Sequence, residues 1–241
     1  MSDVLALADV TVRRGDRELL SHVDWEVEEG ERWVVLGLGS KTTSEVHLID
    51  AHDPTGPMRC VAARREGVEY DVEPAADHLL IVHNERQPEG DLAWAPIDAT
   101  SHEQWQPLLD RAEGERFVGV DAFDDFAVLS LRADGLPTLR LLPRVATSAP
   151  FVGGDYGEPR PLGIDADLAS VALGPVADPD TDRIRVVHES WVSPRTVLDV
   201  VVATGEETVL KRQPVVGVDL ADYEQQRTWA SAPDGTQIPV S

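Results

Sequence analysis

The chain has 241 residues, 42% of them hydrophobic, which is enough to bury one large core or two modest ones. It carries 44 acidic residues against 21 Lys and Arg, and its formal net charge of -23 argues against nucleic acid as a partner, because phosphates would be repelled. The same charge could attract cationic ligands such as peptides rich in Arg or Lys, but solubility or adaptation to salt is the favoured explanation.

Neither a membrane span nor a secretory signal is visible in the chain. No apolar run approaches the roughly 18 residues that cross a bilayer, and the N-terminus has no basic segment followed by an apolar core. Cys60 is the only cysteine, which rules out an intrachain disulfide and fits a reducing cytoplasm. We therefore expect a cytoplasmic protein without membrane contact, in which Cys60 is a small buried apolar residue.

Short apolar runs broken by Gly, Pro, Asp and Asn dominate the chain, and this pattern is typical of an all-β fold. The runs recur with a period of about 45 residues, the size of a four-stranded propeller blade. Four such units are predicted. Their strands are 23–30, 32–39, 44–51 and 58–63; 68–73, 78–84, 92–98 and 105–109; 116–123, 126–135 and 136–143; and 168–174, 183–190, 196–205 and 207–213.

Alternation within these runs predicts which side chains share a face of a sheet. Ile184, Val186 and His188 fall on one side of their strand, and Leu198, Val200 and Val202 form a similar set on the next strand. Tryptophans could fill the space between blades, or be scattered core residues of a β-sandwich: Trp94, Trp105, Trp191 and Trp229.

The main helical pattern covers residues 101–111, where Pro107 limits it to a turn or two.

The tail, LKRQPVVGVDLADYEQQRTWASAPDGTQIPVS from residue 210, ends in a turn and the start of a strand. It resembles the junction in enzymes of the prolyl oligopeptidase family, most closely oligopeptidase B, where a β-propeller leads into a catalytic α/β-hydrolase domain. The segment GSKTTSEVHLIDAHDPTG from residue 39 is similar to the same family. The matching tail residues are Lys211, Arg212, Gln213, Pro214, Asp222, Tyr223, Arg227, Trp229, Ala230, Asp234, Gly235 and Thr236.

This resemblance implies a partial β-propeller of about four blades over residues 39–212, as an open arc or a non-native closure, followed by a linker at 213–241 towards a hydrolase domain. The family's propeller has seven blades, so bare blade faces predict self-association. In that family the propeller admits short peptides to a serine peptidase, and oligopeptidase B cleaves after Arg or Lys. The triad lies in the hydrolase domain, so we expect a non-catalytic propeller with no cofactor; the alternative is a protein-interaction scaffold.

Residues 1–37 resemble the opening strands of an ABC-transporter ATPase, and as a domain of residues 1–38 they would complete the first blade. Such a subunit continues into a phosphate loop, G-x-x-x-x-G-K. After Gly37 this chain keeps Lys41, Thr42 and Thr43, but Ser40 replaces the last glycine that the phosphate cradle needs. A β-hairpin turn containing GSKTT is the favoured interpretation, and a degenerate nucleotide-binding remnant is the second alternative.

No catalytic or metal-binding pattern stands out. The nucleophile motif G-x-S-x-G of α/β-hydrolases is absent. The histidines lack metal-ligand spacing and are expected at the surface or in turns: His22, His47, His52, His78, His83, His102 and His188. We therefore expect no catalytic, cofactor-binding or metal-binding residue.

Acidic residues form one more suggestive pattern. Asp178, Asp180 and Asp182 alternate ahead of Glu189, which partly imitates a calcium-binding loop, but Arg183 takes the place of the required glycine. The segment is better interpreted as an acidic loop between strands. The acid pairs Glu28–Glu29 and Asp124–Asp125 are likewise predicted to be solvated turns.

Overall fold

The computed structural model describes residues 5–14, 17–27, 32–145, 151–162, 168–176 and 178–240, with the backbone alone for residues 5–27. The described residues form β-strands, turns and three short 3₁₀ helices, without an α-helix, which confirms the predicted all-β class. None of the helices in these ranges is long and apolar enough to cross a bilayer. The chain divides into two compact units: Met1–Val72 with Asp98–Gln104, and Glu73–Ile97 with Trp105–Ser241.

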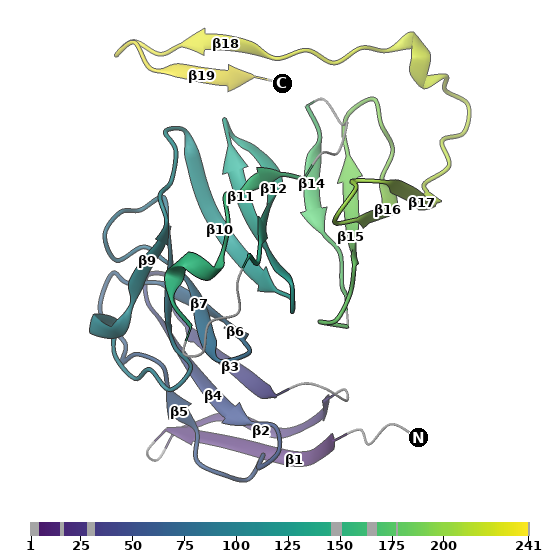
Figure 1. Ribbon diagram of the computed structural model, residues 1–241. Helices are drawn as coiled ribbons and strands as arrows, with labels where there is room; N and C mark the ends of the chain where they lie inside the picture. The colour runs from purple at the N-terminus through teal and green to yellow at the C-terminus, as the bar shows by residue number, and fades with distance from the viewer. Residues whose placement is uncertain are drawn as a thin grey trace. The chain divides into compact units, whose positions relative to one another are not determined.

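The first unit contains a hairpin and a three-stranded sheet (Figure 1). The hairpin pairs β1 (Leu5–Arg14) with β2 (Arg17–Val27), and the sheet has the order β3 (Trp33–Gly39), β4 (Ser44–Asp50), β5 (Arg59–Cys60). The sequence analysis predicted residues 23–30 in the same sheet as residues 32–39. This prediction is wrong for residues 23–27, because they belong to β2, which pairs with β1; residues 28–30 lie outside the described residues. Strands adjacent in the chain pair at small entropic cost, so β2 has an equally near partner on its N-terminal side.

Three four-stranded sheets follow, each with its strands in chain order. They confirm the predicted units beginning at residues 68, 116 and 168. Pro107 lies in a strand, β9 (Gln106–Leu109), and the predicted helical segment is reduced to a single 3₁₀ turn at His102–Gln104. The strands are β6 (Tyr70–Ala75), β7 (His78–His83), β8 (Asp91–Pro96) and β9 (Gln106–Leu109); β10 (Glu115–Ala122), β11 (Phe126–Ala133), β12 (Leu136–Pro143) and β13 (Arg160–Pro161); β14 (Ser170–Leu173), β15 (Arg183–Glu189), β16 (Thr196–Val201) and β17 (Glu207–Arg212).

Strand β11, FAVLSLRA, is buried on both of its faces. Leu129 and Leu131 pack with Leu80 and Leu92 of the β6–β9 sheet. Phe126 and Val128, which point the other way, pack with residues of β15 and β16 in the β14–β17 sheet. The β10–β13 sheet is therefore a middle layer between two neighbouring sheets, which is the arrangement of propeller blades.

The β11–β12 connection helps to keep this middle sheet in register. Ala133 pairs with Leu136 across a two-residue turn, Asp134-Gly135, and both turn residues have positive φ (49° and 83°). An Asp-Gly turn with this geometry matches the twist of antiparallel strands. Since a slip by one residue would turn every side chain of β12 to the opposite face, this turn helps to fix which residues meet each neighbour.

The β14–β17 sheet has one buried face and one more exposed face. Ile184, Val186 and His188 are buried on the first face, with Leu198 and Val200 beside them, which confirms the predicted alternation. On the opposite face, Arg185 forms an ion pair with Asp199, with an Nε to Oδ1 distance of 2.9 Å. Beyond β16, all six residues of β17 are exposed.

Residues after β17 form a 3₁₀ turn at Leu220–Asp222 and a hairpin of β18 (Thr228–Ser231) and β19 (Gln237–Val240). The hairpin confirms the predicted turn and strand in the tail. The tryptophans divide: Trp105 is buried and Trp94 packs against the core, whereas Trp191 and Trp229 are exposed. The prediction that all four tryptophans lie in the core is wrong for the last two.

Candidate functional site

The turn between β3 and β4 contains the residues that resembled a phosphate loop. The Ser40 N–H donates to the carbonyl of Thr43 at 2.8 Å, and the hydroxyls of Ser40 and Thr43 are hydrogen-bonded to each other at 2.8 Å. The Thr42 N–H points to the Ser40 hydroxyl at 3.4 Å. These groups close a hairpin turn, which confirms the interpretation of GSKTT as part of a hairpin.

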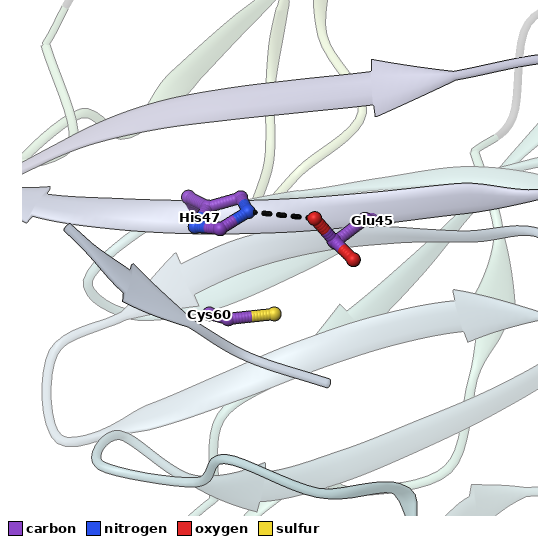
Figure 2. Close-up of side chains that lie close together, drawn as sticks. All are labelled: Glu45, His47 and Cys60. Carbon is purple, nitrogen blue, oxygen red and sulfur yellow. Dashed lines mark hydrogen bonds and ion pairs between the residues drawn. The ribbon is translucent and has the colours of Figure 1, made fainter. Parts of the chain in front are cut away.

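Glu45, His47 and Cys60 lie together on the sheet of the first unit (Figure 2). His47 on β4 is paired directly with Cys60 on β5, and Glu45 is two residues before His47, so all three side chains share one face. Nε2 of His47 is 3.0 Å from Oε1 of Glu45. One donor atom from each residue lies within 4.8 Å of the others. The register thus gathers a carboxylate, an imidazole and a thiol.

The surroundings hold these side chains in place. Glu45 is only 6% exposed, and the backbone N–H of Arg64 donates to its Oε2 at 3.1 Å. The half-buried Cys60 thiol donates to the carbonyl of Ala62 at 3.2 Å, an oxygen that also accepts the Tyr70 hydroxyl at 2.6 Å. Burial, with smaller effects of the Cys60 and Glu45 charges, raises the pKa of Tyr70 to about 12, so its hydroxyl stays protonated.

Cys60 therefore differs from its predicted role as a plain buried apolar residue. It is partly exposed, and it has an imidazole and a carboxylate beside it. The group could not be found from spacing along the chain, because Cys60 is thirteen residues after His47. The available signal was the Glu-x-His spacing in a predicted strand, but the register of the next strand was needed to place the cysteine.

Most of the other described histidines are buried. The expectation of histidines at the surface or in turns is wrong for the strand residues His78, His83 and His188, whereas the buried His102 does lie in a 3₁₀ turn. His52 follows the expectation: it is exposed and forms a hydrogen bond with Asp50. The side chain of His22 and the pair Glu28–Glu29 lie outside the described residues. Sequence alone could not separate the buried histidines from the exposed one, because their burial depends on which sheet covers them.

His78 has the most enclosed position of these. Its ring stacks on Phe151, with 3.6 Å between ring centroids, and its Nε2 lies 3.3 Å from the Tyr156 hydroxyl. Nδ1 is 3.1 Å from Oδ1 of Asp77. Burial lowers the pKa of His78 below its usual 6.5, and the nearby Arg144 acts in the same direction, while Asp77 opposes both. The ring is therefore neutral at physiological pH.

Two acidic loops meet in the second unit. The N–H of Asp124 in the β10–β11 turn donates to the carbonyl of Pro179 at 3.1 Å. Asp178, Asp180 and Asp182 on the second loop are exposed, as are Asp124 and Asp125. The prediction of solvated acidic loops is confirmed for both segments. The hydrogen bond joins two loops that carry five exposed aspartates between them.

Comparison with known proteins decides the family. Residues 6–213 match the family model of the N-terminal β-propeller domain of prolyl oligopeptidase. The chain belongs to the prolyl oligopeptidase family. Because the match starts at residue 6, it also covers nearly all of the N-terminal segment, and the resemblance of residues 1–37 to an ABC-transporter ATPase receives no support.

Individual relatives agree with this assignment. The chain is 30% identical over 215 residues to dipeptidyl aminopeptidase BI of Pseudoxanthomonas mexicana, covering 88% of this chain and 28% of the relative. It is 29% identical over 211 residues to protease 2 of Moraxella lacunata, covering 87% of this chain and 29% of the relative. The chain thus spans less than a third of the length of these relatives.

Solved structures show the same fold. Oligopeptidase B of Leishmania major superposes with a TM-score of 0.73 at 25% identity, over 90% of this chain and 32% of that one. Oligopeptidase B of Trypanosoma brucei, with covalently bound antipain, has the same TM-score at 24% identity, over 90% of this chain and 33% of that one. The four-stranded sheets described above therefore match the blades of the N-terminal β-propeller domain of this family.

The buried His78 makes the stability of the fold depend on pH. A histidine whose pKa is lower in the folded than in the unfolded chain takes up a proton on unfolding. Its contribution to the stability of the fold is therefore complete above pH 6.5 and is lost as the pH falls below that value. We expect the melting temperature of the chain to decrease as the pH is lowered from about 7 to about 5. The variant His78→Gln should weaken this dependence of the melting temperature on pH. Circular dichroism melts at several pH values measure it.

The matched control for this experiment is His52→Gln, which removes an exposed histidine and should leave the pH dependence as in the parent chain. If the parent chain had the same melting temperature at pH 7 and at pH 5, the role assigned to His78 would be contradicted.

Proposed function

We propose that the chain is the non-catalytic propeller that controls the access of short basic peptides to the hydrolase domain of an oligopeptidase B-like peptidase. The family assignment over residues 6–213 carries this proposal, since it identifies the chain as the propeller part of a peptidase. The chain's single cysteine fits action in the reducing cytoplasm.

Charge supports the preference for basic peptides. The chain has a net charge of -23, and the five exposed carboxylates of the Asp124–Asp125 turn and the Asp178–Asp182 loop concentrate part of it on adjoining loops. An acidic surface raises the local concentration of a cationic peptide and its rate of encounter. Arginine-containing peptides would thereby be favoured over acidic ones before any contact with a catalytic group.

A fluorescent peptide with two arginines, compared with its matched glutamate peptide, tests this steering. We expect the arginine peptide alone to bind, and its affinity to fall as salt rises, because exposed charges are screened. The triple variant Asp178→Asn, Asp180→Asn, Asp182→Asn should weaken binding by about three- to tenfold, since each change removes one exposed charge. Fluorescence anisotropy at two salt concentrations measures both effects.

The control is the triple variant Glu206→Gln, Glu207→Gln, Glu224→Gln, which removes the same charge from exposed positions elsewhere in the chain. Equal weakening by the two triple variants would show a general charge effect without a role for the acidic loops. Binding of both peptides alike would contradict the preference for basic peptides. Turnover of an arginine-containing fluorogenic peptide above the blank would contradict the non-catalytic part of the proposal.

The exposed strand β17 supports a second proposal, that the chain self-associates. All residues of β17 are exposed, including Val209 and Leu210, and β17 is the last strand in its sheet. An exposed apolar edge strand is a template for pairing with the same edge of another copy.

We therefore expect the apparent mass in light scattering to rise with concentration, and Val209→Lys to reduce this rise by placing a charge at the edge. Thr208→Lys adds the same charge to β17 without removing an apolar side chain, so it separates the contributions of charge and of apolar contact. A monomer at every concentration would contradict self-association.

A further inference from the structure

We propose that Glu45, His47 and Cys60 bind a thiol-preferring divalent metal ion, with Zn²⁺ as the best match. The antiparallel pairing of His47 with Cys60 brings thiol and imidazole together, and Glu45 on the same face supplies the carboxylate. The site therefore rests on the register of β4 and β5, two strands joined by a turn, and not on a local sequence motif.

The donor set selects the kind of ion. Zn²⁺ takes thiolate, imidazole and carboxylate ligands at about 2.0–2.3 Å, usually in a tetrahedron, so neighbouring donor atoms lie about 3.3–3.7 Å apart. The His47 and Glu45 atoms are already 3.0 Å apart, and the complete set lies within 4.8 Å. Small side-chain rotations reach the tetrahedral spacing. Mg²⁺ and Ca²⁺ prefer sites made of oxygen atoms and should not compete.

The burial of Glu45 favours a cation at this site. Glu45 is 6% exposed, and its Oε2 is held by the Arg64 N–H while Oε1 faces the imidazole. A thiolate beside this buried carboxylate adds a second negative charge, which a divalent cation balances. The neighbouring Tyr70 is not a rival ligand, because its hydroxyl is protonated and hydrogen-bonded to Val46 and Ala62.

Binding of the metal ion changes the protonation of Cys60 and the position of the His47 ring proton. The Cys60 thiol loses its proton to solvent and becomes the thiolate ligand. Nε2 of His47, which is hydrogen-bonded to Glu45 without the ion, binds the ion instead, with the ring proton on Nδ1. Nδ1 is buried and has no hydrogen-bond partner in the described part of the chain, so the site lacks the outer partner that usually raises affinity 10–100-fold. The affinity should therefore be moderate and should increase with pH.

The ion would join β5, which has only two residues, to the longer β4. Three protein ligands leave a fourth tetrahedral position for water. The expected effect is a higher thermal midpoint of the chain in the presence of Zn²⁺, because an ion that binds only the folded state stabilises it.

Titration with Co²⁺, which reports thiolate ligation by an ultraviolet charge-transfer band, tests the site directly. We expect the band to saturate at one equivalent, to disappear when Zn²⁺ is added, and to be absent in Cys60→Ser. Glu45→Gln and His47→Gln should each weaken Co²⁺ binding at least tenfold. His52→Gln, an exposed histidine beside the end of β4, is the control and should leave the titration unchanged.

A second measurement needs no substitution. Since Cys60 is the only cysteine, the rate of thiol alkylation reports this residue alone. Zn²⁺ at a concentration that saturates the site should slow alkylation at least tenfold, and the same concentration of Mg²⁺ should leave the rate unchanged. Alkylation that Zn²⁺ does not slow would overturn the proposal. Thiolate ligation that persists at full strength in both Glu45→Gln and His47→Gln would overturn it too, since it would show binding by the cysteine alone.

Discussion

The burial of strand β11 on both faces is the constraint on which the second unit depends. Leu129 and Leu131 contact the β6–β9 sheet, while Phe126 and Val128 contact the β14–β17 sheet. A strand that is apolar on both faces cannot lie at the surface of a two-layer sandwich, because one face would meet water. It requires a sheet on each side, and repetition of that requirement from sheet to sheet produces stacked blades. Membership of the prolyl oligopeptidase family is consistent with this packing.

The same register that arranges the core also brings reactive side chains together. His47 and Cys60 are far enough apart in the chain to look unrelated, yet the pairing of β4 with β5 places them opposite each other. The loops between strands carry the other chemical feature, the carboxylates of the two acidic turns. Strands thus position Glu45, His47 and Cys60, and the connections between strands carry the exposed carboxylates.

Sequence reasoning succeeded where the information was local. The alternation of Ile184, Val186 and His188 and the strand leading to Asp134-Gly135 were readable because side-chain period and turn chemistry depend on neighbouring residues. It failed where a strand pairing or the burial of a side chain depends on a segment far away in the chain. The pairing of β2 with β1, the burial of His78 under Phe151 and the position of Cys60 beside His47 all depend on which segments meet. Trp191 is exposed for the same reason, since the sequence does not say whether a neighbouring sheet covers it.

The free energy of unfolding of two single variants of β11 tests the central claim most directly. Leu129→Ala removes a side chain from one face and Val128→Ala from the other, with Val118→Ala at an exposed position of β10 as the control. Two-sided packing predicts a loss of about 2–5 kcal/mol for Leu129→Ala and about 1.5–3 kcal/mol for Val128→Ala, with little change for the control. If either β11 variant were as stable as the control, one face of the strand would not be packed, and the stacked-blade account would be wrong.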